Sequence, residues 1–229
     1  MINRKKILTK EPQYNDLIKS AKKFGISKFG IMANQSWNED PKRTLFTLAR
    51  YKFVAKMLSG KKNVLEVGCA DAFGTRIVQQ EVKKITALDF DPIFIQDAED
   101  RKNKYWPMDL FVHDMLSGPF NKSKFDAAFC LDVLEHINKK NENKFMKNLL
   151  SSLTFEAPLI IGIPSKESQA FASKQSKLGH VNCKSGDKFK SDLEKYFKNV
   201  FVFSMNDEVV HTGFYKMAHY LIAICTTRK

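Results

Sequence analysis

Two carboxylates and two histidines have the residue types and spacing of a divalent-metal site. Asp132, Glu135 and His136 lie in one short run, DVLEH, which follows an apolar segment. If a helix begins at or before Asp132, these side chains stand at i, i+3 and i+4 and project from one face. Carboxylates and imidazoles together bind divalent ions such as Mg²⁺, Mn²⁺ or Zn²⁺. We expect His180, in a later polar stretch, to supply the fourth ligand.

A metal-free site is the alternative interpretation of the same residues. Asp132 would then cap the helix or contact a cofactor amine. Glu135 and His136 would orient the residues that contact the ligand without contacting it themselves. His180 or His136 would act as the general base. Both interpretations describe chemistry at a hydroxyl group, because a protonated hydroxyl is a poor nucleophile until a base or a metal activates it.

A second stretch has the composition of a nucleotide-type cofactor cradle. Residues 64–67 form an apolar strand, Gly68 begins a turn of small residues that reaches Gly74, and a helix follows. Backbone N–H groups at such a junction point at whatever lies above the end of the strand. The next strand, residues 85–88, ends at Asp89, whose carboxylate can hold ribose hydroxyls.

Length and patterning indicate a single α/β domain that positions these residues. The chain has 229 residues, is 43% hydrophobic, and contains no apolar run near the ~18–20 residues that a membrane span needs. Strands and helices alternate about five times, and two further strands follow without a helix-length connection. This rhythm predicts a Rossmann-like, doubly wound sheet of seven strands, mostly parallel, with an antiparallel last strand. We expect the strands at 64–67, 85–89, 110–112, 125–131, 158–163, 199–204 and 218–226.

The chain ahead of this domain is expected to be an arm and a lid. Residues 1–40 are polar or irregular, and a helix begins at Asp40-Pro41, an N-cap followed by proline at the first helical position. Met32 and Trp37 either cover an active site or pack on the edge of the core. The main domain is then 41–229.

Two segments of the main domain are expected to lie on the substrate side, residues 165–183 and 205–217. His211, in the second segment, is either a substrate-side group or a solvated loop histidine. His113 and His219 lie in or beside strands and are expected to be structural. Because both segments are short, a small molecule is favoured as substrate.

The net charge of +13 allows two interpretations. A nucleic acid or another polyanion is one possible class of partner; a solvated, lysine-rich surface is the other. The lysines are spread along the chain without a dense basic block, so we favour the solvated surface or an anionic small substrate over RNA.

The four cysteines are unpaired in sequence and no apolar signal region follows the charged N-terminus, which suits a cytoplasmic protein without a membrane anchor. The oligomeric state is not indicated.

Together these motifs resemble the class I S-adenosylmethionine-dependent methyltransferases. VLEVGCADAFGT, the acid in ITALDFDP, Asp114-Met115 and FDAAFCLDVLEHI occur in the order typical of that family, and HYLIAIC resembles its antiparallel final strand. The resemblance covers 41–229. A dinucleotide is the rival cofactor, because Asp89 lies 21 residues after Gly68. The turn lacks G-x-G-x-x-G, however, and the methyl donor is therefore favoured.

The resemblance implies a set of contacts to S-adenosyl-L-methionine. The turn would cradle the methionine part, the end of the second strand would hold the ribose, and later residues would contact the adenine and the amino group. Arg50, on the helix from 41, is a candidate for the cofactor carboxylate. The implied contact residues are Glu66, Gly68, Ala70, Gly74, Asp89, Phe90, Asp114, Met115 and Leu131.

Two alanines depart from the family pattern. Glycine is usual where this chain has Ala70 and Ala72, because glycine allows positive φ and close approach of the cofactor. Alanine at positive φ costs on the order of 1 kcal/mol. Either the turn runs at negative φ here, or the affinity for the cofactor is reduced.

The acid-x-x-Glu-His run with a later histidine resembles a narrower group, metal-dependent O-methyltransferases of the ubiquinone-biosynthesis type (methyltransferase type 11/23-like) and of the small-RNA 2′-O-methyltransferase type. This implies O-methylation of a small metabolite, such as a sugar or a nucleotide-linked sugar. The alternatives are an RNA ribose 2′-O-methyltransferase and a weakly active cofactor-binding module. The catalytic candidates are His180, His136 and Glu135.

Overall fold

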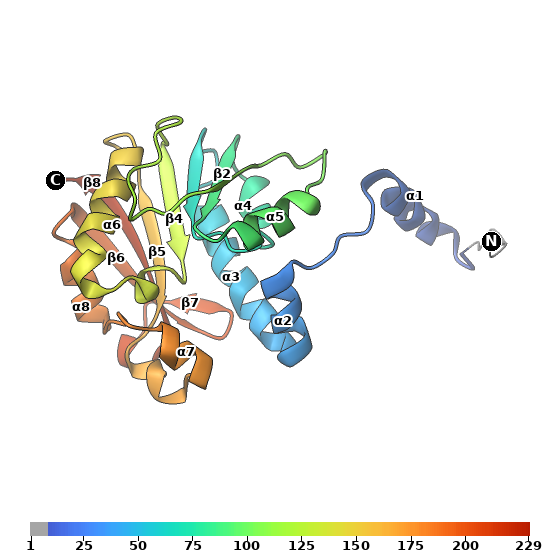
Figure 1. Cartoon of the computed structure of the whole chain (residues 1–229). Coiled ribbons are helices and arrows are strands. Elements are labelled where there is room, and N and C mark those ends of the chain that lie inside the picture. The colour runs from blue at the N-terminus through green and yellow to red at the C-terminus, as the bar shows by residue number, and fades with distance from the viewer. Residues whose placement is uncertain (1–8) are drawn as a thin grey trace.

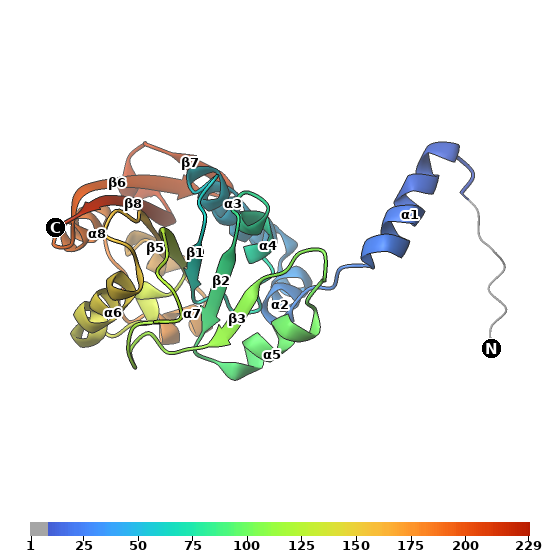
Figure 2. The ribbon, with the colours of Figure 1, turned by 90° about the horizontal axis from the view of Figure 1, so that it is seen from above.

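A computed structural model describes residues 9–229, which are built around one mixed sheet. The strand order is β3-β2-β1-β4-β5-β8-β6-β7, and Figures 1 and 2 show the strands side by side. Strands β1 to β5 pair in parallel, whereas β8 is antiparallel to both β5 and β6, and β7 is antiparallel to β6. The strands are β1 Val64–Val67, β2 Ile85–Asp89, β3 Asp109–Val112, β4 Ala127–Leu131, β5 Leu159–Pro164, β6 Phe197–Asn206, β7 Val209–His211 and β8 Tyr220–Arg228.

The predicted fold class is confirmed, but the expected number of strands is wrong, because the sheet has eight rather than seven. The additional strand, β7, lies within 205–217, which we expected to be a loop. Asp207 adopts a positive φ of 50° and turns the chain back, so that Asn206 pairs with Val209 and Ser204 pairs with His211.

Helices cover both faces of the sheet (Figure 1). Tyr51, Val54 and Leu58 of α3 pack with Val78 of α4 on one face, and α5 extends this layer over β2 and β3. On the other face, α6 and α8 bury side chains that include Phe145. The helices are α1 Asn15–Phe24, α2 Ile31–Glu39, α3 Pro41–Met57, α4 Thr75–Gln79, α5 Pro92–Asp100, α6 Lys139–Ser152, α7 Lys174–Gly179 and α8 Gly186–Leu193. Short 3₁₀ turns occur at η1 Pro12–Tyr14, η2 Leu134–His136, η3 Glu167–Phe171 and η4 Tyr215–Met217.

The N-terminal segment is more ordered than we expected. Residues 25–40 were expected to be irregular, yet α2 forms within them, and the carboxylates of Asp97 and Asp71 accept hydrogen bonds from the N–H groups of Ile31 and Ala33 at its start. These acceptors come from the main domain, so local sequence does not reveal them. The expected start of α3 is present, since the Asp40 side chain accepts from the N–H of Lys42. Residues 1–8 of the expected arm lie outside the described part.

Between residues 9 and 229, none of the helices is both long and apolar enough to cross a membrane. Figure 1 shows α1 standing away from the sheet, and none of its residues is buried. Cys69, Cys130 and Cys225 are buried and Cys183 is half-buried, all as free thiols.

A buried ion-pair network anchors the 165–183 segment where it rejoins the domain. The Nζ atom of Lys184 lies 2.8 Å from Glu142 Oε2 and 2.9 Å from Asp192 Oδ2, and the lysine side chain is 4% exposed. Asn182 donates a hydrogen bond to the same Glu142 oxygen. The network therefore joins this segment to α6 and α8.

Replacing the buried lysine should destabilise the fold strongly. Lys184→Ala leaves two carboxylates without their buried cation, and we expect the free energy of unfolding to fall by about 3–5 kcal/mol. Lys188 contacts Asp192 from a side chain that is 49% exposed, so Lys188→Ala should cost less than about 1 kcal/mol. Urea unfolding monitored by circular dichroism measures both changes, and equal losses would contradict this assignment.

Candidate functional site

The turn after β1 runs through a series of left-handed residues. The φ angles are 78° at Gly68, 46° at Ala70 and 53° at Ala72. The alternative of a turn at negative φ is therefore wrong, and each alanine carries strain on the order of 1 kcal/mol. A Cβ atom on Gly68 would lie 2.2 Å from Cγ2 of Val133, so glycine is also needed for packing at this position.

Asp89 fastens this turn to the end of β2. Its Oδ2 atom accepts from the N–H of Ala70 at 2.8 Å, and its Oδ1 atom accepts from the N–H of Asp91 at 3.0 Å. Burial raises the pKa of the Asp89 carboxyl, against the opposing effect of these backbone hydrogen bonds. The acid lies beside the turn as the sequence predicts, and contact with a ribose stays a prediction.

Glu66 stabilises the turn through two side-chain hydrogen bonds. Tyr51 donates to Oε1 at 2.8 Å and Thr75 donates to Oε2 at 2.6 Å, and the carboxyl is buried. Burial raises the pKa of Glu66 to about 7. A Cβ atom on Gly74 would lie 2.3 Å from the Tyr51 ring, so Gly74 makes room for this tyrosine. Sequence reasoning gave no role to Tyr51, which lies outside the recognised motif, or to Thr75, which is the last residue of VLEVGCADAFGT.

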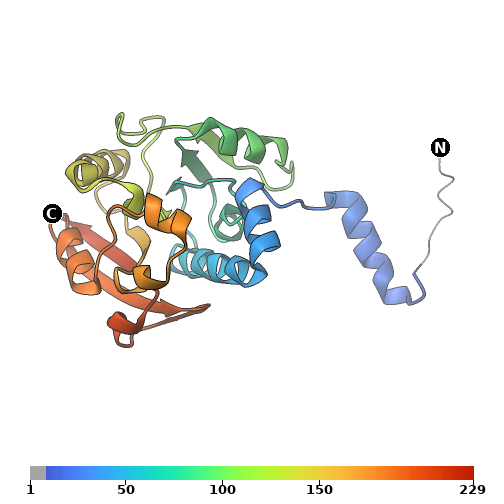
Figure 3. The ribbon, with the colours of Figure 1, turned by 60° about the horizontal axis from the view of Figure 1, so that its bottom comes forward.

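The expected lid packs on the outer side of the same turn. The N–H of Ala33 donates to Asp71 Oδ2 at 2.8 Å, and Phe29 packs between Phe73 and Trp37 at ring-centroid distances of 5.0 and 5.3 Å. Trp37 is 49% exposed. Figure 3, in which the bottom of Figure 1 comes forward, shows α2 at the start of α3 and α7 on the same side of the molecule as α2.

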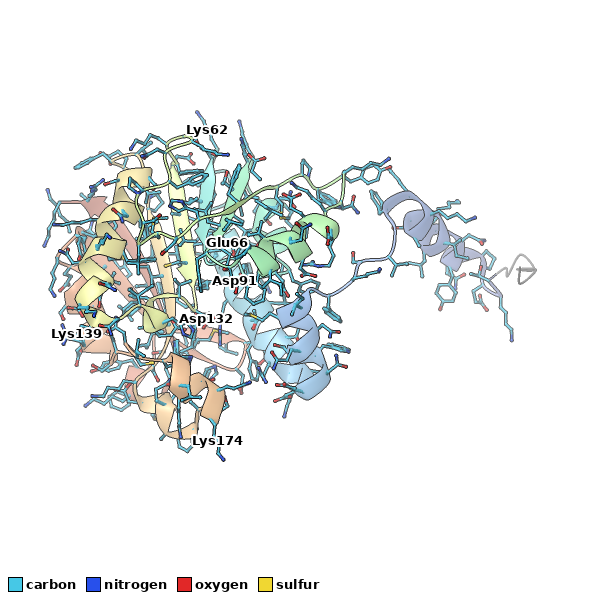
Figure 4. All side chains as sticks on the ribbon, in the orientation of Figure 1. Lys62, Glu66, Asp91, Asp132, Lys139 and Lys174 are labelled. Atoms are coloured by element: carbon cyan, nitrogen blue, oxygen red, sulfur yellow. The ribbon has the colours of Figure 1, made fainter. Side chains whose placement is uncertain are left out.

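The remaining cofactor candidates lie along the same end of the sheet but differ in exposure. Phe90 is 72% exposed, whereas Met115 and Leu131 are buried. Asp114 is exposed, and its carboxylate accepts from the N–H of Leu116. Figure 4 shows Glu66, Asp91 and Asp132 toward this end and Lys62 at the opposite end.

The expected helix from Asp132 is absent, so the prediction of one helical face is wrong. Asp132 adopts a positive φ of 56°, which turns the chain sharply into the short η2 segment. Its Oδ2 atom lies 2.7 Å from Nη1 of Arg50, and the Arg50 guanidinium stacks 3.7 Å above the ring of Tyr220. The structure therefore places Asp132 in an ion pair with Arg50, outside the group of side chains that could share a metal ion.

The other three predicted ligands do come together. Glu135, His136 and His180 each offer a ligand atom, and these atoms lie within 4.8 Å of one another. The two imidazole rings meet edge to face, with 5.1 Å between their centroids. The carbonyl of Glu135 accepts hydrogen bonds from the N–H groups of Val181 and Asn182, both at 2.9 Å, which draws the 165–183 segment against η2.

Hydrogen bonds fix the tautomers of the two histidines. Nδ1 of His136 lies 3.0 Å from the carbonyl of Gly179, and Nδ1 of His180 lies 2.8 Å from Oε1 of Gln169. The Gln169 amide nitrogen donates to the carbonyl of Ser165, which confirms the orientation of the amide. Both Nδ1 atoms must therefore carry the proton, and the Nε2 lone pairs are left for an ion or a proton.

Glu135 is the least satisfied side chain of the site. It is fully buried, and neither carboxylate oxygen has a hydrogen-bond partner among residues 9–229. Burial, followed by the charge of Asp132, raises its pKa well above the ordinary value. A buried carboxylate without partners requires a proton or a cation. The donor set and the unpartnered oxygens therefore fit a divalent metal at Glu135, His136 and His180.

The other histidines lie apart from this cluster. His211 uses both ring nitrogens, with Nε2 bonded to Asn206 and Nδ1 accepting from the N–H of Gly213, and so stabilises the β6–β7 hairpin. His113 bonds to the carbonyl of Gly118. His219 accepts from the N–H of Asp207 at the hairpin turn.

Comparison with known proteins connects this geometry to a family. A family model described as a methyltransferase domain matches residues 64–155, which contain the left-handed turn, Asp89 and the Glu135-His136 pair. The matched segment runs from β1 to the end of α6, and it carries motifs that resemble the class I S-adenosylmethionine-dependent methyltransferases.

One curated relative and two solved structures are similar to this chain. The mitochondrial ubiquinone biosynthesis O-methyltransferase of Schizosaccharomyces pombe is 23% identical over 157 residues, which is 62% of this chain and 55% of that protein. The chain thus spans about half the length of the curated relative it matches.

Two solved structures share the fold of this chain. The N-methyltransferase NodS from Bradyrhizobium japonicum WM9, in complex with S-adenosyl-L-homocysteine, has a TM-score of 0.64 at 16% identity, over 95% of this chain and 99% of NodS. The small RNA methyltransferase HEN1 has a TM-score of 0.60 at 20% identity, over 79% of this chain and 25% of HEN1.

Glu66 should make the stability of this protein depend on pH. Its pKa rises from 4.5 to about 7 on folding, so the folded state binds more protons than the unfolded state between these values. Stability should therefore fall as the pH rises through this window, by about 3 kcal/mol from this group. Glu66→Gln keeps one acceptor and one donor for the two hydroxyls and should remove this contribution. Urea unfolding at pH 4.5 to 8 measures it, and parallel profiles for the two proteins would refute the assignment.

Proposed function

We propose that this methyltransferase transfers a methyl group from S-adenosyl-L-methionine to a hydroxyl oxygen of a small metabolite, such as a sugar or a nucleotide-linked sugar, with a divalent metal at the site. The observation that carries the proposal is the buried, unpartnered Glu135 carboxylate beside the two Nε2 lone pairs of His136 and His180. A bound Mg²⁺, Mn²⁺ or Zn²⁺ would lower the pKa of the acceptor hydroxyl and orient it.

The chain itself supplies positioning and a proton acceptor. Gly179 and Gln169 hold the two imidazoles in one orientation through their Nδ1 protons. Burial, followed by the neighbouring His136, lowers the pKa of His180, so this imidazole is neutral near pH 7. A neutral imidazole can take the hydroxyl proton in a metal-free site, which keeps His180 and His136 as general-base candidates.

The turn from Gly68 to Gly74 would bind the methionine part of the cofactor, and Asp89 the ribose. Arg50 is less available for the cofactor carboxylate than the sequence implies, because Asp132 already pairs with it. Phe90, which is largely exposed, would lie beside the adenine. The S-adenosyl-L-homocysteine named with NodS supports this choice of cofactor.

Oxygen is favoured as the acceptor atom by the ligand cluster and by the relative from Schizosaccharomyces pombe, which is named as an O-methyltransferase. NodS is named as an N-methyltransferase, so the fold alone does not select oxygen. The proposed substrate is anionic and the proposed compartment is the cytoplasm, in keeping with the net charge of +13 and the free cysteines.

A terminal ribose of RNA is the second candidate acceptor. It is supported by the fold shared with a small RNA methyltransferase and by a cleft, described below, that gathers basic and aromatic side chains. A weakly active module is the third candidate, supported by the strain at Ala70 and Ala72.

Calorimetry tests the cofactor site. We expect the chain to bind S-adenosyl-L-methionine and S-adenosyl-L-homocysteine, and Gly68→Ala to weaken binding at least about tenfold, because the new methyl group would overlap Val133 and disturb the turn. Gly118→Ala is the matched control, since open space surrounds that glycine. Absence of binding of either compound to the unaltered chain would refute the proposed function.

Titration with Mn²⁺ or Zn²⁺ tests the metal site. Glu135→Gln should weaken binding at least about tenfold, whereas Glu208→Gln, on the exposed hairpin turn, should leave it unchanged. Because burial raises the pKa of Glu135, a metal ion must compete with protons for this carboxylate, and affinity should increase as the pH rises. Unchanged metal affinity in Glu135→Gln would contradict the metal site. Loss of turnover in His180→Ala would then support the metal-free mechanism.

A further inference from the structure

A cleft of about 1050 Å³ lies between the linker after α1 and the outer surface of α4 and α5. Its walls come from four parts of the sequence, within residues 23–29, 71–77 and 97–108 and at Leu48 of α3. Figure 1 shows the segment after α5 reaching toward α1, with the linker crossing to α2. The cleft is separate from the Glu135 cluster, which is built from segments that follow β4 and β5.

Aromatic rings in the cleft are held between cationic side chains. The Arg76 guanidinium lies 3.4 Å above the Trp106 ring, and the Lys104 ammonium lies 5.2 Å from the Tyr105 ring. Phe24 meets Tyr105 edge to face at 4.9 Å, and Lys23 lies near both of these rings. Tyr105 and Trp106 are 38% and 39% exposed. The rings are therefore oriented by the protein and still accessible.

The positive charge of the cleft is only partly neutralised. Asp71 and Asp97, on its wall, accept hydrogen bonds from the start of α2, and Asp97 also pairs with Arg101. Within residues 9–229, no carboxylate pairs with Lys23, Lys28, Lys104 or Arg76. Nη1 of Arg76 is buried and has no hydrogen-bond partner there. The lysine ammonium groups, rather than this buried donor, are therefore the cations left for an anionic ligand.

We propose that this cleft binds single-stranded nucleic acid. Unpaired bases stack on accessible aromatic rings, and their phosphates pair with lysine and arginine. A membrane or an apolar peptide would require a continuous apolar surface, whereas the rings of Phe24, Tyr105 and Trp106 each adjoin a cation. The net charge of +13 favours a polyanion. The proposal does not depend on methyl transfer, because the rings and cations that carry it lie outside the Glu135 cluster, although residues 71–73 of the proposed cofactor turn also line the cleft.

Fluorescence anisotropy with a labelled oligouridine of about 12 nucleotides tests the proposal. We expect affinity to fall steeply between about 50 and 200 mM salt, with a slope of about 0.7 per phosphate contact. Trp106→Ala and Tyr105→Ala should each weaken binding roughly tenfold through lost stacking. Lys104→Gln should reduce the salt slope. Phe155→Ala is the control, because this ring is 59% exposed and is not part of the cleft.

Two competitors distinguish the proposal from weaker alternatives. Heparin has the charge but no bases; if it binds as tightly as the RNA and the aromatic variants bind RNA normally, the cleft is a general polyanion surface and the proposal is wrong. Uridine monophosphate binding as tightly as the oligonucleotide would instead indicate a nucleotide pocket and would also overturn it. Thermal unfolding checks that each variant is folded. Binding of S-adenosyl-L-homocysteine without any RNA binding would reject this inference alone and leave the proposed function standing.

Discussion

The buried carboxylate of Glu66 is the interaction on which the cofactor end of the sheet depends. By accepting hydrogen bonds from Tyr51 and Thr75, it joins α3, β1 and the start of α4 at one point. The tyrosine ring occupies the space that a side chain at Gly74 would need. The chain from Gly68 must therefore pass around this ring to reach α4, and it does so through left-handed residues. Strain at Ala70 and Ala72 is offset by the hydrogen bond from Ala70 to Asp89 and by the burial of Ala72.

Asp132 connects the turn after β1 to the segment that follows the neighbouring strand, β4. The left-handed conformation of Asp132 turns the chain so that Val133 packs against Gly68 and Glu135 enters the interior. The ion pair with Arg50 stabilises the turn, since a non-glycine residue at positive φ persists only where its surroundings hold it. The cofactor turn and the ligand cluster are thus mechanically joined through one contact between Gly68 and Val133.

Much of the fold could be predicted from sequence, because the buried parallel strands are short apolar runs and α3 has a clear Asp40-Pro41 start. What could not be predicted depends on contacts distant in sequence. The start of α2 is stabilised by carboxylates of the main domain, and β7 forms only because Asp207 reverses the chain. Neither the start of α2 nor the strand β7 produces a periodic pattern of apolar residues in the sequence.

The candidate site shows the same division. The residue types of Glu135, His136 and His180 suffice to predict a ligand cluster, and the structure brings their ligand atoms together. The helical spacing used to include Asp132 fails, because its backbone conformation is set by packing and by Arg50 rather than by local propensity. The aromatic and basic lining of the cleft was missed for a related reason: residues 23–29 and 101–106 become neighbours only when the linker lies across the α4–α5 layer.

Unsatisfied polar atoms support a distinction between structural and ligand-binding acids in this chain. Glu66 and Asp89 are both buried, and each carboxylate oxygen has a donor within the protein. Glu135 is buried as deeply, yet both of its oxygens lack donors, and the adjacent histidines keep their Nε2 lone pairs free. Native proteins rarely leave buried polar atoms unpaired without a ligand or a functional reason. The contrast between these carboxylates, more than any motif, separates the acids that build the fold from the one whose unpaired oxygens fit the proposed cation.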